Sequence, residues 1–275
     1  MTVHNLLLEA ATLIGRRDAE LLLAHTLRQP RIWLLAHPEA EPTTAEAASF
    51  LALTARRAAG EPAQYLTGMQ EFFGLELLVT PAVLIPRPET EHLVEAALAW
   101  SQTQRKPLRF LDIGTGSGAI ALAIAANLAD AEVVATDISS AALAVARDNA
   151  MRLGVSDRIR FLESDLLSAL GPTELPFDAI LSNPPYIPSS DVATMQREVV
   201  AHEPHTALFA GPDGLDIYRR LIPAAHAALR HGGLLALEIG FGQRDDLAEL
   251  LTGWDNIRFV DDYAAIPRVA LAERP

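Results

Sequence analysis

The sequence predicts an α/β fold in which a doubly wound parallel sheet follows a small helical domain. From about residue 107 onward, apolar runs typical of buried strands alternate with helical patterns. In that order a parallel sheet collects helices on both of its faces. The last stretch, from about residue 256, holds two strand patterns without a helix between them, which predicts a C-terminal antiparallel strand pair. Residues 1–70 carry helical periodicity instead.

Composition narrows the classes of function. The chain has 275 residues, half of them hydrophobic, which is enough for a sizeable core in one or two domains. Its net charge of −13 argues against a large non-specific grip on nucleic acid, because such a grip needs clustered Lys and Arg. The lack of cysteine excludes disulfides, a thiolate nucleophile and cysteine-based metal sites.

No segment reads as a signal peptide or a membrane span. The first residues lack a basic segment followed by an apolar core, and no apolar run approaches the roughly 20 residues that cross a bilayer. His202 and His205 are not spaced as metal ligands. We therefore expect a soluble, cytoplasmic protein with no metal and no membrane partner.

The first domain, residues 1–70, is expected to be a helical bundle. Two candidate apolar helix faces consist of Leu6, Leu7, Leu13 and Ile14, and of Leu21, Leu22 and Leu27. Thr43 and Glu46 have the separation of a capping box, which predicts the start of another helix.

A short connector, residues 71–88, changes the pattern. Its Phe72, Phe73, Leu75, Leu77 and Val79 suggest a strand pair with a turn around Thr80-Pro81. The second domain, residues 89–275, then opens with a helix. Its strands are predicted at 108–114, 132–138, 158–164, 177–183 and 234–240.

A glycine-rich loop follows the first of these strands and leads into a helix. It consists of Gly114, Thr115, Gly116, Ser117 and Gly118. Glycines permit backbone dihedrals barred to other residues and allow a ligand to approach closely. Asp137, about 20 residues further on, ends the second strand, where a carboxylate can accept hydrogen bonds from both ribose hydroxyls of an adenosine. The alternative is a tight turn in which Asp137 merely caps a helix.

The spacing of the glycines indicates which nucleoside binds. A dinucleotide site favours G-x-G-x-x-G, whereas this loop has G-x-G-x-G with Asp112 just before it. A carboxylate there would repel a pyrophosphate, and it suits the ammonium or sulfonium of S-adenosylmethionine (SAM). After the third strand, Asp165 and Leu166 are candidates to flank the adenine, although Asp165 is equally a candidate helix cap.

The fourth strand runs into Asn183, Pro184, Pro185 and Tyr186, at the same edge of the sheet as the glycine loop. The prolines fix φ and push the residues before them out of the α region, so the backbone is stiff. The Asn183 side-chain oxygen and the Pro184 carbonyl then form two acceptors beside the flat face of Tyr186. A proline-rich loop with Asn183 as a turn residue is the alternative.

Two acceptors beside an aromatic ring suit a planar NH₂ group, such as the amide of glutamine or the exocyclic amine of adenine or cytosine. Hydrogen bonds accepted from that NH₂ strengthen as positive charge develops on its nitrogen during methyl transfer. Alignment of the nitrogen, the methyl carbon and the sulfur accounts for much of the remaining reduction of the activation barrier. No metal, triad or obligatory base is required.

These motifs resemble those of class I methyltransferases that act on amino groups. Three further stretches, at 71–91, 203–221 and 237–243, resemble the peptide chain release factor N5-glutamine methyltransferase family (HemK/PrmC) over nearly the whole chain. The resemblance implies a Rossmann-like sheet, and methylation by SAM, giving S-adenosylhomocysteine, of the glutamine in the Gly-Gly-Gln tripeptide of class I release factors. It assigns SAM binding to Gly114 to Gly118, Asp137, Leu166 and Asn183, and the substrate glutamine to Asn183 to Tyr186.

Rival hypotheses remain open at this stage. An adenine-N6 methyltransferase of DNA or RNA would use the same Asn-Pro-Pro-Tyr site, but a basic patch and a target-recognition domain are missing. A nicotinamide-dependent oxidoreductase would leave Asn183 to Tyr186 unexplained, and a binding module without catalysis is a third class. Arg87 and Glu203 either border the site or form a structural salt bridge. Residues 1–70 are expected to recognise the protein substrate.

Overall fold

The computed structural model describes residues 1–275, which divide into two compact units. The helical unit comprises residues 1–69 and 196–202, and the sheet unit comprises residues 70–195 and 203–275. None of the helices is both long and apolar enough to cross a membrane.

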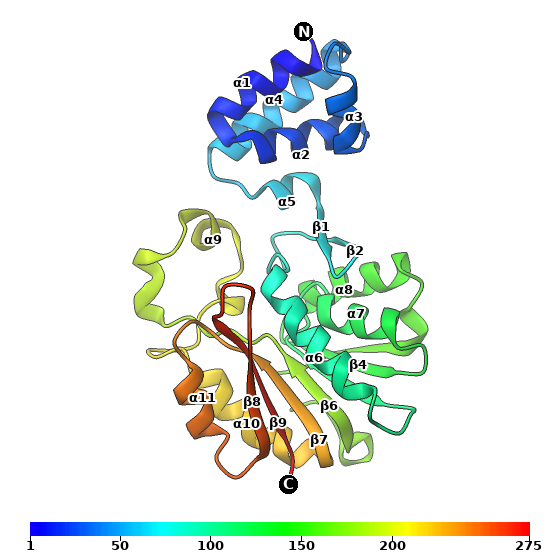
Figure 1. The fold of residues 1–275 in the computed structure, drawn as a ribbon, viewed down its shortest axis with the longest axis vertical. Helices are drawn as coiled ribbons and strands as arrows, with labels where there is room; N and C mark the ends of the chain where they lie inside the picture. Colours follow the sequence, from blue (N-terminus) through cyan, green and yellow to red (C-terminus); the bar gives the residue numbers. More distant parts are fainter. The chain divides into compact units, whose positions relative to one another are not determined.

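Five helices make up the first part of the helical unit (Figure 1). They are α1 (Val3–Ile14), α2 (Arg16–Leu27), α3 (Arg31–Ala36), α4 (Thr44–Ala58) and α5 (Ala63–Thr67). The predicted capping box starts α4, since the Thr43 side chain accepts from the Glu46 amide and the Glu46 carboxylate accepts from the Thr43 amide at 2.8 Å. Of the predicted apolar face of α1, Leu6 is buried together with Val3 and Ala10, whereas Leu13 in the last turn is 67% exposed.

Helix α9 (Arg197–His202) belongs to the helical unit although both of its chain ends continue into the sheet unit. The Arg57 guanidinium of α4 bonds the Glu198 carboxylate at 2.7 Å and the Asp18 carboxylate at 2.6 Å. Arg57 is mostly buried, so this three-member ion network ties α9 to the bundle.

The sheet unit begins with a hairpin of β1 (Met69–Phe72) and β2 (Leu75–Leu78). The predicted turn around Thr80-Pro81 is wrong as the hairpin turn. The strands reverse at Phe73 and Gly74, which both have positive φ (52° and 74°). A two-residue hairpin turn needs positive φ at both positions, and glycine supplies one at no steric cost.

One buried asparagine anchors this hairpin. Asn149 accepts from the Leu78 amide at 2.6 Å and donates to the Leu78 carbonyl at 3.0 Å. The same side-chain NH₂ donates to the Ser117 carbonyl at 2.9 Å. The end of β2 is thus hydrogen-bonded through one side chain to the glycine loop.

Seven strands form the main sheet, in the order β5-β4-β3-β6-β7-β9-β8. Their bounds are β3 (Arg109–Ile113), β4 (Glu132–Asp137), β5 (Ile159–Glu163), β6 (Phe177–Ser182), β7 (Leu229–Glu238), β8 (Asp255–Asp261) and β9 (Pro267–Glu273). Strands β3 to β7 pair in parallel, while β9 is antiparallel to both β7 and β8. The predicted doubly wound sheet with a C-terminal antiparallel pair is confirmed. Chain order reverses between β3 and β6, where such sheets bind ligands.

Helices cover both faces of this sheet (Figure 1). One face carries α6 (Glu91–Ser101), α7 (Ala119–Asn127) and α8 (Ser140–Arg152), and the other carries α10 (Asp216–Ala228) and α11 (Arg244–Leu250). Short 3₁₀ turns are η1 (Pro88–Thr90), η2 (Ser156–Arg158), η3 (Pro172–Glu174), η4 (Ser189–Thr194) and η5 (His205–Ala207). Neighbouring strand residues alternate between the faces, as Phe110 and Leu111 do, which gives two separate hydrophobic clusters.

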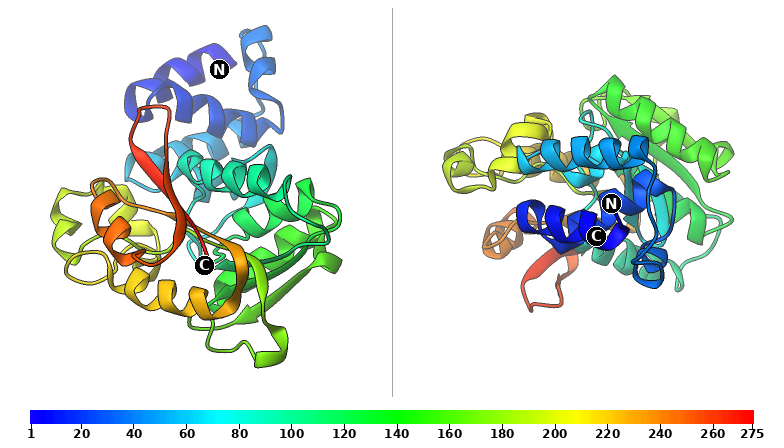
Figure 2. Two further views of the ribbon diagram at one scale, coloured as in Figure 1. Left: turned by 60° about the horizontal axis from the view of Figure 1, so that its bottom comes forward. Right: turned by 90° about the horizontal axis from the view of Figure 1, so that it is seen from above.

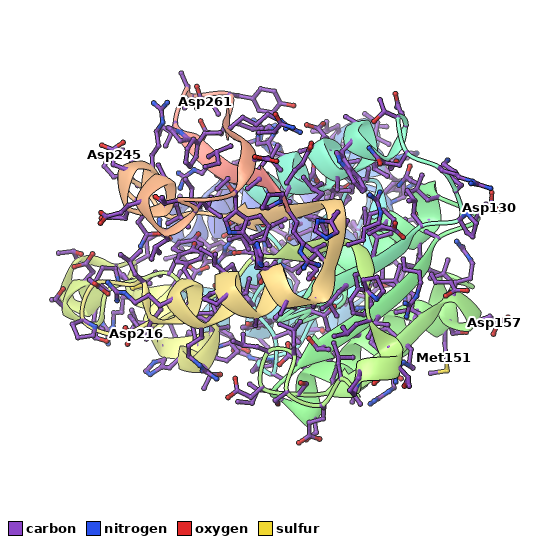
Figure 3. All side chains as sticks on the ribbon, turned by 90° about the horizontal axis from the view of Figure 1, so that it is seen from below. Asp130, Met151, Asp157, Asp216, Asp245 and Asp261 are labelled. Atoms are coloured by element: carbon purple, nitrogen blue, oxygen red, sulfur yellow. The ribbon has the colours of Figure 1, made fainter.

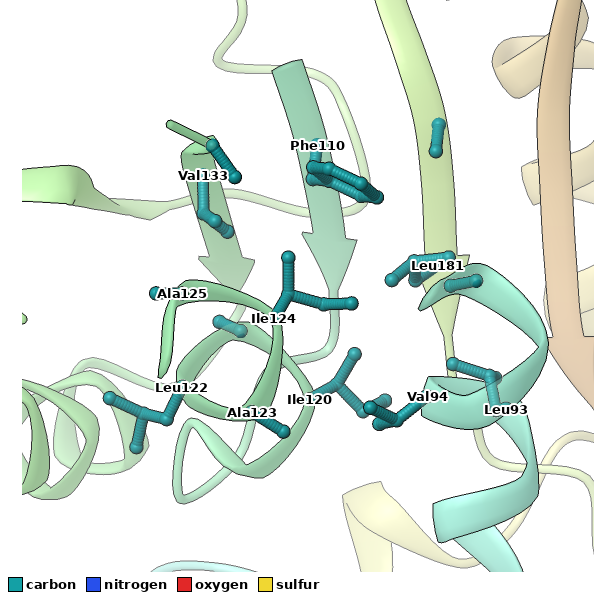
Figure 4. Packing of buried hydrophobic residues seen from close by; sticks show 14 of the residues in the cluster. Leu93, Val94, Phe110, Ile120, Leu122, Ala123, Ile124, Ala125, Val133 and Leu181 are labelled. Carbon is teal, nitrogen blue, oxygen red and sulfur yellow. The ribbon is translucent and has the colours of Figure 1, made fainter. Parts of the chain in front are cut away.

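Helix α7 is buried along almost its whole length, which explains why it has no polar face. Figure 4 shows Ile120 and Ile124 on this helix directed toward Phe110 of β3, Leu181 of β6 and Val94 of α6. The glycine loop that precedes α7 is therefore fixed at one end by β3 and at the other by a fully packed helix.

The surface of the sheet unit is acidic, in keeping with the net charge. Asp130, Asp157, Asp216, Asp245 and Asp261 are exposed and lie at its periphery in Figure 3. The loop between β8 and β9 projects from the sheet (Figure 2, red), and Tyr263 in this loop is 94% exposed.

Candidate active site

A cavity of about 360 Å³ lies at the carboxyl ends of the central strands of the sheet unit. It is lined by Gly114, Gly116, Asp137, Asp165, Leu166, Asn183, Pro184 and Pro185, and on other sides by residues 82–84, Pro204 and Phe209. The structure thus brings together most of the residues that sequence analysis selected. Thr115, Ser117, Gly118 and Tyr186 lie behind this lining rather than in it.

The glycine loop has a conformation that only glycine adopts readily. Gly114, Gly116 and Gly118 all have positive φ, at 72°, 56° and 88°. At Gly118 a Cβ atom would also meet the Leu122 side chain at 2.9 Å. The loop passes close to the cavity because no side chain separates its backbone from that space.

Asp112 is buried behind the loop and is only partly hydrogen-bonded. Its Oδ2 accepts from the Thr115 hydroxyl at 2.6 Å and from the Ala121 amide at 3.2 Å, whereas its buried Oδ1 has no partner within the chain. Burial raises the pKa of Asp112 to about 7, although both hydrogen bonds act in the opposite direction. An unpartnered buried carboxylate oxygen fits a cationic ligand group, as the ammonium of SAM would be.

Asp137 is held by backbone amides on both oxygens. Oδ2 accepts from Gly116 and Oδ1 from Ser139, each at 2.9 Å. Burial raises the pKa of Asp137, and the amide hydrogen bonds lower it. Each carboxylate oxygen keeps a second lone pair, so the geometry leaves room for two further donors such as ribose hydroxyls.

Asp165 and Leu166 follow β5 and both line the cavity. Asp165 accepts from the Arg220 guanidinium at 2.6 Å and is half exposed. Residues 166–170, which follow Asp165, form turns rather than a helix, so Asp165 is not a helix cap. Leu166 has a φ of 52° and packs against the cluster under α10, which directs part of its side chain into the cavity wall.

Asn183 follows β6 directly and is held by a side chain from a distant part of the sequence. Its Nδ2 donates to the Thr90 hydroxyl at 3.0 Å, and Thr90 donates in turn to the Glu238 carboxylate at 2.5 Å. One N–H of the Asn183 amide is thus directed at Thr90, which places Oδ1 on the other side of the side chain as its acceptor. Beside it, the Ser182 hydroxyl donates to the Ile113 carbonyl at 2.7 Å and joins the ends of β6 and β3.

Tyr186 is fixed by three groups that sequence analysis did not select. Its hydroxyl donates to Glu238 at 3.2 Å, and its carbonyl accepts from the Gln243 amide at 3.0 Å. Gly214 approaches so closely that a Cβ atom there would lie 2.2 Å from the Tyr186 carbonyl oxygen. Burial, followed by the charge of Glu238, holds the pKa of Tyr186 above its ordinary value, so its hydroxyl stays a donor.

Arg87 and Glu203 form an ion pair rather than a free pair of site residues. The Arg87 guanidinium bonds Glu203 at 2.5 Å, and Glu203, which is 4% exposed, also accepts from the Ile85 amide at 3.4 Å. Residues 82–84 and Pro204, next to these partners, line the cavity. Of the two roles considered for Arg87 and Glu203, the structure shows the structural salt bridge. This ion pair joins the chain segments that hold residues 82–84 and Pro204, both of which line the cavity.

Thr90, Glu238 and Gln243 are the residues that sequence reasoning missed. They lie within the stretches 71–91 and 237–243 that carried the family resemblance, but no local pattern gives them a role. Thr90 and Glu238 are 148 residues apart in the chain. Only the fold, which packs α6 and the turn before it against β7, brings these two residues together.

The sheet order and a cavity that joins a glycine loop, an acidic strand end and an Asn-Pro-Pro-Tyr segment define a class I methyltransferase. Family models agree with this, since residues 4–68 match the PrmC N-terminal domain and residues 94–212 match the methyltransferase small domain. The release factor glutamine methyltransferase of Koribacter versatilis is 46% identical over 98% of this chain and 95% of its own length. The chain belongs to the release factor glutamine methyltransferase family.

Two further comparisons agree in different ways. The release factor glutamine methyltransferase of Moorella thermoacetica is 48% identical over 94% of this chain and 91% of its own length. Among solved structures, the catalytic domain of hMettl16 bound to a 3′UTR hairpin has a TM-score of 0.59, covering 88% of this chain and 85% of that one. At 19% identity this second likeness concerns the fold alone.

Proposed function

We propose that this protein transfers a methyl group from SAM to the side-chain amide nitrogen of the glutamine in the Gly-Gly-Gln tripeptide of class I peptide chain release factors, and so modulates translation termination. The observation that carries the proposal is the placement of Asn183 to Pro185 in the same cavity as the glycine loop and Asp137. Two proteins named release factor glutamine methyltransferase, which are 46% and 48% identical to this chain over nearly its full length, support the proposal.

SAM supplies an electrophilic methyl group, and its other parts match the cavity's donors and acceptors. Asp137, which lines the cavity, would accept hydrogen bonds from the ribose hydroxyls, and the buried charge of Asp112 behind the glycine loop would favour the ammonium. The backbone of the glycine loop, which reaches the cavity at Gly114 and Gly116, would hold the methionyl chain, and Leu166 would pack on adenine. Asp165 already accepts a hydrogen bond from Arg220, so it could accept from the adenine amine only while it keeps that partner. S-Adenosylhomocysteine leaves as the product.

The Asn183 segment holds the substrate amide. The Asn183 Oδ1 and the Pro184 carbonyl accept the two N–H bonds of the glutamine NH₂, and Pro185 keeps their spacing fixed. Tyr186, whose hydroxyl is fixed by Glu238 and whose carbonyl is fixed by Gln243, does not line the cavity and would support the Asn183–Pro185 backbone from behind. As nitrogen gains positive charge, both acceptors bind it more strongly, which stabilises the transition state over the ground state. The excess proton is lost to solvent after transfer.

Residues 1–70 are proposed to recognise the intact release factor, with residues 71–88 as the linker to the methyltransferase domain, residues 89–275. The helical unit exposes large apolar side chains on α1, α3 and α4, namely Leu8, Leu13, Ile32, Leu35 and Leu51. Exposed apolar side chains that gather on one surface are typical of a protein–protein contact, and we propose that these side chains contact the release factor.

This recognition role is best tested by surface substitutions, because removal of residues 1–70 would also strip α9 of its Arg57 partner. Leu13→Ser with Ile32→Ser should raise KM for the intact factor about tenfold, the effect of losing two apolar contacts. A short Gly-Gly-Gln peptide should be methylated as by the wild type. An unchanged KM for the intact factor would remove this surface from the proposal.

The alternative of an adenine-N6 methyltransferase is not favoured by any feature of the site. The Asn183 Oδ1 and the Pro184 carbonyl could also accept hydrogen bonds from the amine of adenine. The protein's net charge of −13, however, opposes binding to a phosphate backbone. We accordingly propose a protein partner, no direct nucleic-acid substrate, and a cytoplasmic location where release factors act.

The test combines three parallel reactions with radiolabelled SAM. One contains a class I release factor, one the same factor with its Gly-Gly-Gln glutamine replaced by alanine, and one duplex DNA. Label in the intact factor alone is expected. Label in DNA alone would mean that Asn183 to Tyr186 bind a base, and equal label in both factors would mean that another residue is the target.

A further inference from the structure

A chain of hydrogen bonds connects Asn183 to a buried carboxylate on the next strand. Asn183 Nδ2 donates to Thr90 Oγ1 at 3.0 Å, Thr90 Oγ1 donates to Glu238 Oε2 at 2.5 Å, and the Tyr186 hydroxyl donates to Glu238 Oε1 at 3.2 Å. Thr90 is 4% and Glu238 2% exposed, so water does not compete for these bonds. The chain joins η1 to the ends of β6 and β7.

The direction of each bond follows from the number of protons available. A carboxylate only accepts, and a threonine hydroxyl has a single proton to give. Since Thr90 donates that proton to Glu238, the Thr90 hydroxyl oxygen can only accept a hydrogen bond from Asn183. A flipped Asn183 would set Oδ1 against an oxygen with no proton left, which is unfavourable in a buried site. The charge on Glu238 therefore decides which end of the Asn183 amide turns away from Thr90.

We infer that Thr90 and Glu238 are positioning residues that orient the Asn183 amide so that Oδ1, rather than Nδ2, faces the substrate. The inference rests on the proposed function, because only an acceptor at this position binds the NH₂ of a substrate amide. With the opposite orientation two NH₂ groups would face each other, and the transition state would lose one of its two hydrogen bonds. Neither residue contacts the reacting atoms.

Several charged and titratable groups surround Glu238. The Tyr186 hydroxyl contacts its carboxylate, the Tyr218 hydroxyl donates to its backbone carbonyl at 2.6 Å, Glu89 opposes its charge and Arg268 favours it. Burial is the largest influence and raises the pKa of Glu238 to about 7. A protonated Glu238 can donate to Thr90, which then has its own proton for Asn183 Oδ1. Orientation is therefore best defined above about pH 7.

The first test compares Thr90→Val with Thr90→Ser in the full-length protein. Valine keeps the shape and lacks the hydroxyl, whereas serine keeps the hydroxyl. With SAM saturating, we expect Thr90→Val to lower kcat for release factor methylation about tenfold to a hundredfold, the scale of a misplaced reacting group. Thr90→Ser should restore most of it. The number of SAM sites measured by calorimetry gives the folded fraction, so a loss that reflects misfolding alone is separated.

The second test is the pH profile of kcat for the wild type and Glu238→Gln, again at saturating SAM. Glutamine has one acceptor oxygen for two hydroxyl donors, so Thr90 no longer has a fixed direction. We expect a wild-type kcat that falls as pH drops through about 7, and a Glu238→Gln kcat that is low and lacks this step. A merely structural Glu238 would lower thermal stability but leave the shape of the profile unchanged.

The outcomes separate the inference from the function on which it rests. If the wild type leaves the Gly-Gly-Gln glutamine unlabelled, the proposed function fails and the inference with it. If the wild type labels it and Thr90→Val retains wild-type kcat per SAM site, the proposed function stands and the positioning role is overturned. A Thr90→Ser variant as slow as Thr90→Val would also overturn it, since the hydroxyl would not be the feature that matters.

Discussion

The glycine loop is held by hydrogen-bond partners that lie at most 32 residues away in the sequence, whereas the side of the cavity around Asn183 is held by partners that lie much further away. Thr115 bonds Asp112 three residues away, and Gly116 bonds Asp137 after 21 residues. Asn183 bonds Thr90 across 93 residues, and Thr90 bonds Glu238 across 148. The glycine loop thus depends on partners at moderate sequence separation, while the acceptor for the reacting amide depends on contacts that span 93 and 148 residues of the chain.

This difference predicts that the two sides fail in different ways when altered. Changes near the glycine loop should weaken SAM binding and leave the chemical step intact once SAM is saturating. Changes near Asn183 should slow the chemical step and leave SAM binding largely intact.

The largest effect is expected for Asn183→Ala. It removes the side-chain acceptor and should lower kcat about a hundredfold to a thousandfold, the range found when one transition-state hydrogen bond is lost. Its SAM affinity, measured by calorimetry, should change only a few-fold, because Asp137 and Asp112 are untouched. An Asn183→Ala variant whose SAM affinity falls about a hundredfold while its kcat at saturating SAM stays normal would invert the assignment of the two sides.

An intermediate effect is expected for Asp137→Asn. The two backbone amides on this carboxylate and the proposed ribose hydroxyls all need acceptors, so SAM affinity should fall about tenfold to a hundredfold, as for loss of charged hydrogen bonds. Asp165→Asn, at a half-exposed carboxylate already paired with Arg220, is the matched control and should weaken binding less. Equal losses in the two variants would contradict the role given to Asp137.

A smaller, pH-dependent effect is expected at Asp112. Burial raises its pKa to about 7, and an ammonium beside it would lower that pKa. SAM binding should therefore release a proton near neutral pH, and affinity should rise as pH increases toward about 7. Titration calorimetry in buffers of different ionisation enthalpy measures this release. In Asp112→Asn the rise should be absent, and a rise of unchanged size would place its origin in another group.

The raised pKa of Asp112 also makes the folding stability of the protein depend on pH. The folded protein binds this proton more tightly than the unfolded chain does, so the contribution of Asp112 to stability decreases as pH rises from about 4 to about 7. Bound SAM should offset that decrease, because it stabilises the charged form.

The same difference between local and distant contacts explains what the sequence predicted. The strand run ending at Ile113, the glycine loop and Asp137 are read from periodicity and spacing, and the doubly wound parallel sheet followed from the alternation of strands and helices. The hairpin turn was misplaced because Phe73, unlike Gly74, is a residue that seldom takes positive φ, so no local signal marked the turn.

The partners of Asn183 and Tyr186 were beyond sequence reasoning for another reason. Glu238 ends an apolar strand, where a buried carboxylate is an exception, and Gln243 lies in a short loop after it. Their roles come from parallel pairing of β6 with β7, which sets Ser182 beside Leu237 and so brings the two strand ends together. The spacing of these residues along the sequence does not predict that the two strand ends are adjacent.

The most direct test of the central claim is to locate the methyl group by mass spectrometry after the protein has acted on an intact class I release factor. We predict a single added methyl on the side-chain nitrogen of the Gly-Gly-Gln glutamine, formed by the wild type and absent with Asn183→Ala. A methyl on any other residue, or the same product from Asn183→Ala at the wild-type rate, would contradict the account of this site.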